Sequence, residues 1–115
     1  MKHLCAVVTE IDERGFILAV NFDSIKPDQF CDESCLVEKG AHKFITLRSF
    51  IYYRRIAQLS AKAVSANIKS GYYPSQPAIA DDLFKRICNG ILDSDHTPRW
   101  AREFYRRVEG LDKKK

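Results

Sequence analysis

The sequence lacks a long hydrophobic run. Its longest continuous apolar stretches, at residues 4–8 and 16–20, hold five residues each, whereas a membrane-spanning helix needs about 20. We therefore expect no membrane segment. The first residues resemble a secretory signal only superficially, because the apolar stretch is short and acidic residues follow it at once. We accordingly expect a cytoplasmic protein.

Motifs of fixed spacing are also missing. The chain has no nucleophile elbow, phosphate-binding loop or paired-carboxylate motif, and no recognition-helix motif or zinc finger. It has no internal repeat, and its only low-complexity segment is the lysine run at 113–115. These absences argue against the enzyme classes that such motifs mark and against tight reading of duplex DNA. We predict no cofactor.

Cysteine is scarce, with four residues in the chain. In a reducing compartment they are not expected to form disulfides, and we interpret Cys5 and Cys88 as small buried hydrophobic side chains. Cys31, Cys35 and His42 offer three soft ligands, but their spacing differs from the usual zinc patterns. We predict no metal site and keep these three as candidate ligands. The alternative places Cys35 in the core and Cys31 in a loop.

Length and composition fit one soluble domain of 115 residues, of which 45% are hydrophobic and 30% charged. β-branched and aromatic residues predict a β-rich part at 1–59. Its expected strands are 3–11, 16–22, 35–38 and 44–47, the first two antiparallel and joined by a turn at 12–15. Residues 50–59 fit both a strand and a helix, and their aromatic and β-branched content favours a strand.

Three helices are predicted at 60–110, followed by a basic tail at 111–115. The first is capped by Ser60, turns Val64 and Ile68 inward and ends at Gly71. The second is capped by Ser75, with Pro77 in its first turn, and carries an apolar stripe of Ile79, Leu83, Ile87 and Ile91 that Asn89-Gly90 interrupts. The third opens at Thr97-Pro98, turns Trp100, Phe104 and Val108 inward and stops at Gly110.

No acidic residue occurs between positions 39 and 71, a stretch that holds seven basic residues. The 38 residues before it carry eight acidic and three basic residues, although the net charge of the whole chain is +4. A central block without carboxylates to offset its charge indicates an anionic partner.

Tyrosine and arginine follow one another within this block at 52–55. Aromatic rings stack on bases, and guanidinium groups pair with phosphates. Because neighbouring side chains of a strand point to opposite faces, Arg54 and Arg55 are not expected to line one groove together. The predicted binding residues for RNA or another anionic macromolecule are Lys43, Arg48, Tyr52, Arg54 and Lys62. The alternative interpretation is a solvated face with one tyrosine in the core.

A catalytic interpretation rests on His42, Thr46, Arg48 and Ser49, which lie close in sequence. They offer a base, two hydroxyls and a phosphate clamp. A single histidine after a turn more often binds loop backbone, and hydroxyl residues are common at strand edges. We therefore predict no catalytic residue and retain these four only for the case that the protein is a ribonuclease.

Residues 35–45 and 49–54 resemble a family of small proteins from phages and other mobile elements. That family shares a segment of the form Cys-x-Leu-x-x-Gly-Asp-His-Pro-Phe-Ile followed by Ser-Tyr-x-x-Tyr. Its fold is similar to the SH3-like barrel of PemK/MazF-type growth-inhibitor toxins. This chain departs from the pattern at Ala41, Lys43 and Phe50, where the family has Asp, Pro and Tyr. The resemblance implies an SH3-like barrel and, through the toxin class, RNA cleavage or gyrase poisoning.

We therefore expect an α+β domain in which a small, partly open SH3-like barrel at residues 3–59 is followed by three helices at 60–110. The leading hypothesis is a non-enzymatic accessory protein of mobile elements that binds RNA or another anionic partner through residues 39–55. The second is a protein-interaction or homo-oligomeric module, or a toxin–antitoxin component, that uses sheet edges and Tyr72-Tyr73. The third is a ribonuclease toxin.

Overall fold

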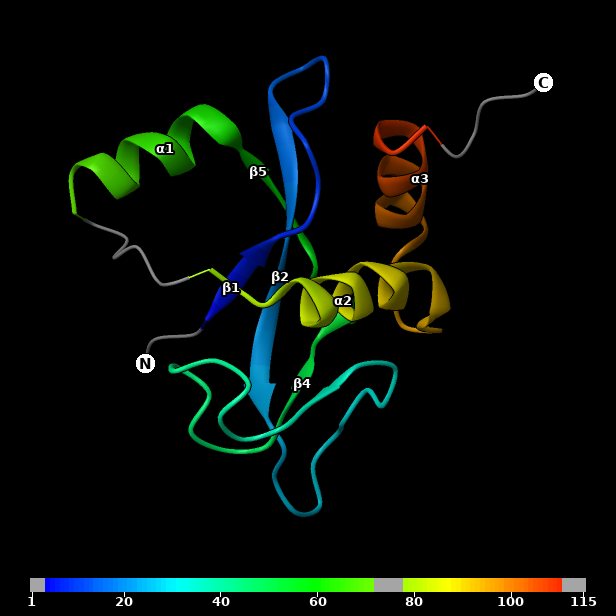
Figure 1. Ribbon diagram of the computed structural model, residues 1–115. Coiled ribbons are helices and arrows are strands. Elements are labelled where there is room, and N and C mark those ends of the chain that lie inside the picture. Colours follow the sequence, from blue (N-terminus) through cyan, green and yellow to red (C-terminus); the bar gives the residue numbers. More distant parts are fainter. Residues whose placement is uncertain (1–3, 72–77, 111–115) are drawn as a thin grey trace.

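The computed structural model describes residues 4–71 and 78–110, and in these an open antiparallel sheet of five strands carries three helices (Figure 1). The expected α+β class is confirmed. The strands are β1 (Cys5–Val7), β2 (Phe16–Ser24), β3 (Leu36–Val37), β4 (Ser49–Ile51) and β5 (Ala57–Ser60). A 3-10 turn, η1 (Tyr53–Arg55), precedes β5, and the α-helices are α1 (Ala61–Lys69), α2 (Asp81–Asp93) and α3 (Arg99–Val108). None of these helices is long and apolar enough to cross a membrane.

The sheet is built around β2. β1 pairs with one edge of it, and the predicted antiparallel hairpin is confirmed. Gly15 closes the hairpin turn at a φ of 87°, a conformation that suits glycine, and its N–H donates to the Asp12 carbonyl over 3.0 Å. Along the other edge, β4 pairs with residues 22–24 of β2 and β5 pairs with residues 16–19. β3 then adds to β4.

Residues 50–59, predicted as one strand, form two strands with η1 between them. Tyr52 donates its N–H to the Asn21 carbonyl over 3.0 Å, and pairing resumes with Ala57 opposite Ala19. Residues 53–56 therefore face a single β2 residue, Val20, and the extra length is taken up by the 3-10 turn. Like a large bulge, the insertion changes the direction of the side chains. The prediction of a continuous strand was wrong at this point.

One face of the sheet packs against α2 and α3. The core includes Leu18 and Val20 of β2, Ile87 of α2 and Phe104 of α3. The apolar stripe predicted for the second helix is confirmed, since Leu83, Ile87 and Ile91 are buried and Ile79, just before the helix, packs against the core. The helix begins at Asp81, with Asp81 and Asp82 in its first turn, where carboxylates favour a helix N-terminus. The predicted cap Ser75 and Pro77 lie outside the described residues.

Tyr53, the first residue of η1, explains the glycine inside α2. The Tyr53 ring is fully buried, and its hydroxyl donates to the carbonyl oxygen of Ile87 over 2.6 Å. A Cβ atom on Gly90 would lie 2.0 Å from the Tyr53 hydroxyl oxygen, so only glycine leaves room for the ring. The contact holds η1 against the helix. Burial also raises the pKa of the Tyr53 hydroxyl far above its ordinary range.

The predicted cap and stop of the first helix and the predicted stop of the third are confirmed. Thr97 does not cap the third helix, which begins at Arg99 with Pro98 at the N-cap position, and the Thr97 hydroxyl has no hydrogen-bond partner within the described residues. The Ser60 hydroxyl accepts the Ala63 N–H over 3.2 Å, and Gly71 and Gly110 follow their helices at positive φ. The predicted inward faces of these helices are wrong in part. Ile68 is 45% exposed and Trp100 is 44% exposed. The reason is the tertiary packing. The main contact of α1 is with β5, and no residue of α1 is buried, whereas α3 turns Ala101 and Phe104 to the core in place of Trp100.

Two further predictions fail near the sheet. Residues 44–47 form no strand, because the Ile45 N–H donates to the His42 carbonyl over 2.8 Å and the Ile45 carbonyl accepts the Gly40 N–H over 2.9 Å. These backbone groups are therefore hydrogen-bonded within the loop and cannot pair with a neighbouring strand. Cys5 is exposed, since β1 presents alternate residues to opposite faces and Ala6 takes the core side.

Candidate nucleic-acid interface

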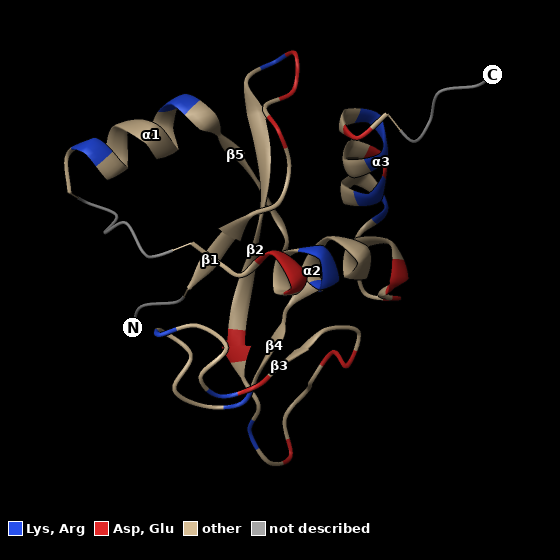
Figure 2. Ribbon diagram, viewed as in Figure 1, with Lys and Arg blue, Asp and Glu red and all other residues tan. Residues whose placement is uncertain are grey.

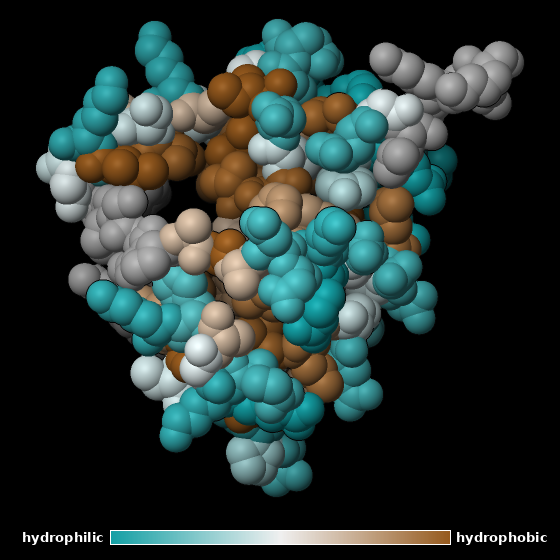
Figure 3. Space-filling view, viewed as in Figure 1, coloured by the Kyte–Doolittle hydropathy of each residue, from teal (hydrophilic) through white to brown (hydrophobic). Residues whose placement is uncertain are grey.

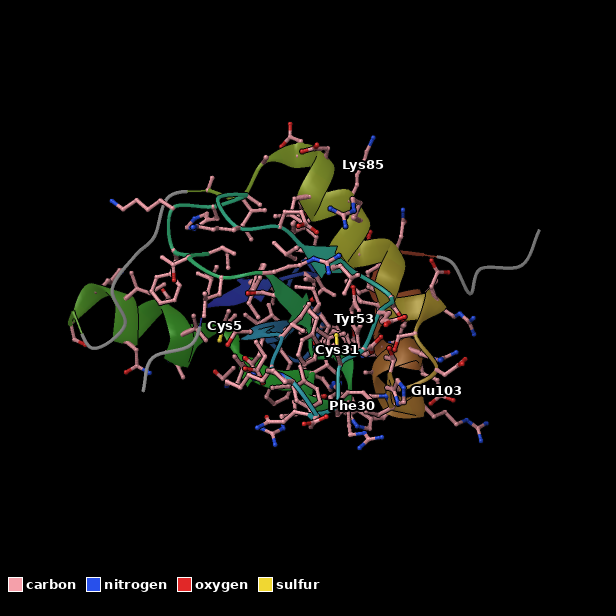
Figure 4. The ribbon with its side chains drawn as sticks, turned by 90° about the horizontal axis from the view of Figure 1, so that it is seen from below. Cys5, Phe30, Cys31, Tyr53, Lys85 and Glu103 are labelled. Carbon is pink, nitrogen blue, oxygen red and sulfur yellow. The ribbon has the colours of Figure 1, made fainter. Side chains whose placement is uncertain are left out.

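Four aromatic side chains from three distant parts of the chain contact one another, among them the buried ring of Phe50. Phe30, from the loop after β2, lies at the centre, with its ring centroid 5.4 Å from that of Tyr52 and 6.2 Å from that of Phe50. His96, from the loop before α3, meets Phe30 edge to face at 4.9 Å. Phe30 is 39% exposed, and Figure 4 places it on the opposite side of the molecule from Lys85 of α2. The centre of the group is thus open to solvent.

Two arginines of η1 complete the group, which we call the aromatic–arginine cluster (Phe30, Phe50, Tyr52, Arg54, Arg55 and His96). The Cζ atom of Arg54 lies 5.1 Å from the Phe30 ring centroid, and that of Arg55 lies 4.8 Å from the Tyr52 centroid. Both distances are typical of cation–π contacts. Arg54 Nη2 also lies 3.4 Å from Nδ1 of His96.

The two arginines of the cluster are not paired with acidic side chains. Within residues 4–71 and 78–110, neither Arg54 nor Arg55 forms an ion pair with a carboxylate. Both side chains are exposed. A guanidinium that lies over an aromatic ring and has no carboxylate partner keeps N–H groups available to a phosphate.

The 3-10 turn is what brings the two arginines together. Strand geometry would have sent Arg54 and Arg55 to opposite faces. In η1, Tyr53 points into the core instead, and the two residues after it reach rings that contact each other. The expectation that these arginines could not serve one surface was therefore wrong.

Only part of the predicted binding set lies in this cluster. Tyr52 and Arg54 belong to it, whereas Lys43, Arg48 and Lys62 have none of its ring contacts. Arg48 instead pairs with Glu38 at 2.9 Å. Arg48 and Lys62 also flank opposite ends of β2, since Ser49 pairs with Ser24 and Ser60 with Phe16. At about 3.3 Å per residue these ends are roughly 25 Å apart, and Figure 2 shows basic segments on separate elements.

Sequence reasoning missed Phe30 and His96. Both lie in loops with no hydrophobic periodicity, and they are 66 positions apart in the sequence. No local signal links them, because their meeting depends on how the loop at 25–35 and the loop at 94–98 fold over η1. Arg55 was recognised as basic but excluded on strand geometry.

Two of the four residues kept as candidates for catalysis, His42 and Ser49, form hydrogen bonds to nearby backbone. His42 is buried, and its Nδ1 accepts the Phe44 N–H over 3.0 Å. The Ser49 hydroxyl donates to the Leu47 carbonyl over 2.9 Å. Thr46 and Ser49 line a small cavity of about 180 Å³ that neither His42 nor Arg48 lines. This arrangement gives the histidine a structural partner and separates it from the cavity.

The candidate zinc ligands are not assembled. Across the part of the chain that the structure describes, no three His, Cys, Asp or Glu side chains lie close enough to hold a metal ion, so Cys31, Cys35 and His42 stay apart. Cys35 is buried in the core, and burial raises the pKa of its thiol. Cys31 is half-buried in its loop.

A second pair of arginines has a different environment. Arg14 and Arg107 both donate to Oδ2 of Asp12, over 3.0 and 3.1 Å, and the Asp12 side chain is fully buried. Loss of water opposes ionisation of this carboxyl group, but the Phe16 N–H, the Arg14 side chain and the Arg14 N–H outweigh it and lower its pKa to about 2. This group joins the β1–β2 hairpin to α3.

Comparison with known proteins identifies no relative of this chain. No protein-family model matches the chain, and no curated protein or solved structure is significantly similar to it.

Proposed function

We propose that the protein binds single-stranded nucleic acid, RNA foremost, through the aromatic–arginine cluster. The observation that supports this best is the placement of two guanidinium groups, free of carboxylate partners among the described residues, on two aromatic rings in contact. Proteins that bind single strands combine positive charge for the backbone with aromatic rings for the bases.

The chemistry favours a single strand over a duplex. A base can stack on Phe30, Tyr52 or a guanidinium plane only when it has left its neighbours in a helix. Arg54 and Arg55, beside those rings, would pair with the flanking phosphates. The rings have no pattern of donors and acceptors for base edges, so weak sequence preference and strong salt dependence are expected.

The resemblance at residues 35–54 extends this proposal. From it we propose an SH3-like relationship for the sheet and a role as an accessory protein of mobile elements. The buried position of His42 and its bond to loop backbone support a structural role for that segment over a ribonuclease site.

Fluorescence anisotropy with a labelled single-stranded RNA oligonucleotide tests the proposal. Affinity should fall steeply between about 50 and 200 mM salt, and duplex RNA of the same sequence should bind more weakly. The variant Arg54→Gln/Arg55→Gln should reduce the salt dependence, lowering the slope of log affinity against log salt by about 1.4, roughly 0.7 for each lost phosphate contact.

A matched control separates this cluster from charge alone. Lys62→Gln/Lys69→Gln removes the same two charges from α1, whose lysines have no aromatic contact among those in the cluster. It should leave the slope nearly unchanged. Equal losses in the two double variants would assign binding to net charge, and absence of binding at low salt would exclude the proposed function.

A second candidate, a protein-interaction or homo-oligomeric module, has its own support. In the described part of the sheet, the outer edge of β1 is unpaired. Val7 of β1, Leu59 of β5 and Ile68 of α1 are exposed, and Figure 3 shows hydrophobic surface on α1 and on the adjoining part of the body. Light scattering after size exclusion tests it: a monomer at all concentrations would count against self-association, and Val7→Lys should dissociate a dimer that uses this edge.

A further inference from the structure

One buried hydrogen bond joins the two loops that supply Phe30 and His96. The Ser94 hydroxyl donates to Oδ2 of Asp32 over 2.6 Å, and the two residues are 62 positions apart. Asp32 is 2% exposed and Ser94 is 0% exposed. A hydroxyl that donates to a carboxylate at such a short distance makes a charge-assisted bond, which is stronger than a bond between neutral groups.

Further bonds fix the backbone on both sides of this contact. The other carboxylate oxygen of Asp32, Oδ1, accepts the Ser34 N–H over 2.9 Å. The Ser94 hydroxyl accepts the His96 N–H over 3.0 Å while it donates to Asp32. The Ser94 carbonyl accepts a bond from the Arg102 guanidinium of α3. The serine hydroxyl thus uses its donor and an acceptor position at once.

The ring contact lies directly beside this bond. Phe30 is two residues before Asp32, His96 is two residues after Ser94, and their rings meet at 4.9 Å. Neither ring belongs to a helix or a strand, so regular backbone pairing does not hold it. Immobilising a side chain on binding costs free energy, and a site that is already ordered avoids that cost.

We propose that Asp32 and Ser94 are positioning residues that lock Phe30 against His96 and so preorganise the aromatic–arginine cluster for its ligand. This inference rests on the proposed function for the use of the cluster. The locking itself is a property of the free protein and can be measured without RNA.

The chemistry of the pair explains why a carboxylate is required. Asp32 accepts at both oxygens, from Ser94 on one side and Ser34 on the other. Loss of water opposes its ionisation, but the bonds from Ser94 and Ser34 outweigh that effect and lower the pKa of Asp32. An asparagine has the same shape but only one accepting oxygen. It can accept from Ser34 and reach Ser94 only by donating to its hydroxyl oxygen, which loses the charge-assisted bond and leaves the hydroxyl proton without its acceptor.

The test uses Asp32→Asn, with Asp28→Asn as the matched control. Asp28 lies in the same loop, is exposed and has a φ of 60°, which asparagine tolerates, so the control makes the same change of charge without touching Ser94. The first measurement is the NMR shift of the His96 ring protons, which the ring current of Phe30 displaces. The second is affinity for the single-stranded RNA oligonucleotide.

Asp32→Asn should move the His96 ring signals toward those of a Phe30→Ala variant and weaken RNA binding about fivefold, the cost of ordering one side chain. Ser94→Ala should do the same, and the double variant should add little to either single change. Asp28→Asn should alter neither measurement.

Unchanged His96 signals in folded Asp32→Asn and Ser94→Ala would overturn the proposal. Loss of folding in both variants would overturn it as well, because the pair would then be a general core element. If the unaltered protein binds no RNA, the proposed function fails, and the His96 signals alone decide whether the pair positions the rings.

Discussion

Two pairs of arginines in this protein have opposite environments. Arg14 and Arg107 converge on the buried carboxylate of Asp12 and join the hairpin to α3. Arg54 and Arg55 lie on aromatic rings at the surface, with no carboxylate partner among the described residues. The difference shows that an arginine's partner, rather than its exposure, separates a structural from an available charge, since Arg14 is also half-exposed.

The largest expected effect comes from breaking the support of η1. In Gly90→Ala the new Cβ atom would meet the buried Tyr53 ring, which must shift and lose its bond to Ile87. We expect the free energy of unfolding to fall by about 3 kcal/mol, from overpacking and a lost buried hydrogen bond. Urea denaturation measures it. The exposed neighbour Asn89→Ala is the control and should be neutral or slightly stabilising.

A reciprocal pair of variants sharpens the contrast. Arg54→Ala should weaken binding of single-stranded RNA about tenfold, through one lost phosphate contact and one lost stacking surface, and should barely alter stability. Arg107→Ala should lower the urea midpoint, because it removes a donor from buried Asp12, and leave RNA affinity unchanged. Fluorescence anisotropy measures RNA affinity, and urea denaturation measures stability, for both variants. If both variants lose the same property, the two pairs do not differ in role.

A smaller effect separates charge from shape at Arg54. Arg54→Lys keeps the positive charge but loses the planar group that lies over Phe30. RNA affinity should fall about threefold, less than in Arg54→Ala, while the salt slope stays the same. Full affinity in the lysine variant would show that stacking of the guanidinium contributes nothing.

The last comparison concerns the pH dependence of Asp12, which is small near neutral pH in the unaltered protein. Its pKa is lowered to about 2 in the folded protein, below the roughly 3.9 of an ordinary aspartate. The stability it contributes is therefore complete above about pH 4 and is lost as the pH falls toward 2. Denaturation midpoints across this range should drop in the unaltered protein. Asp12→Asn should be less stable at neutral pH and lack this contribution to the acid slope.

Local rules predicted much of the fold because they depend on neighbours in sequence. The Ser60 cap, the stops at Gly71 and Gly110 and the hairpin turn ending at Gly15 all follow from backbone chemistry over a few residues. The α+β class followed from periodicity, and the apolar stripe of the second helix predicted its buried side. The strand predicted at 44–47 failed because loop hydrogen bonds competed for the same backbone groups.

The sequence by itself shows that tyrosine and arginine are neighbours in a block without acidic residues. This part of the candidate site could be predicted from residue types alone. The tertiary structure decided the rest. The insertion of Tyr53 beside Gly90 turned Arg54 and Arg55 to one surface. Packing brought Phe30 and His96 to them across long stretches of sequence. Contacts of this kind depend on which segments share a surface after folding, and no period or cap in either segment encodes that choice.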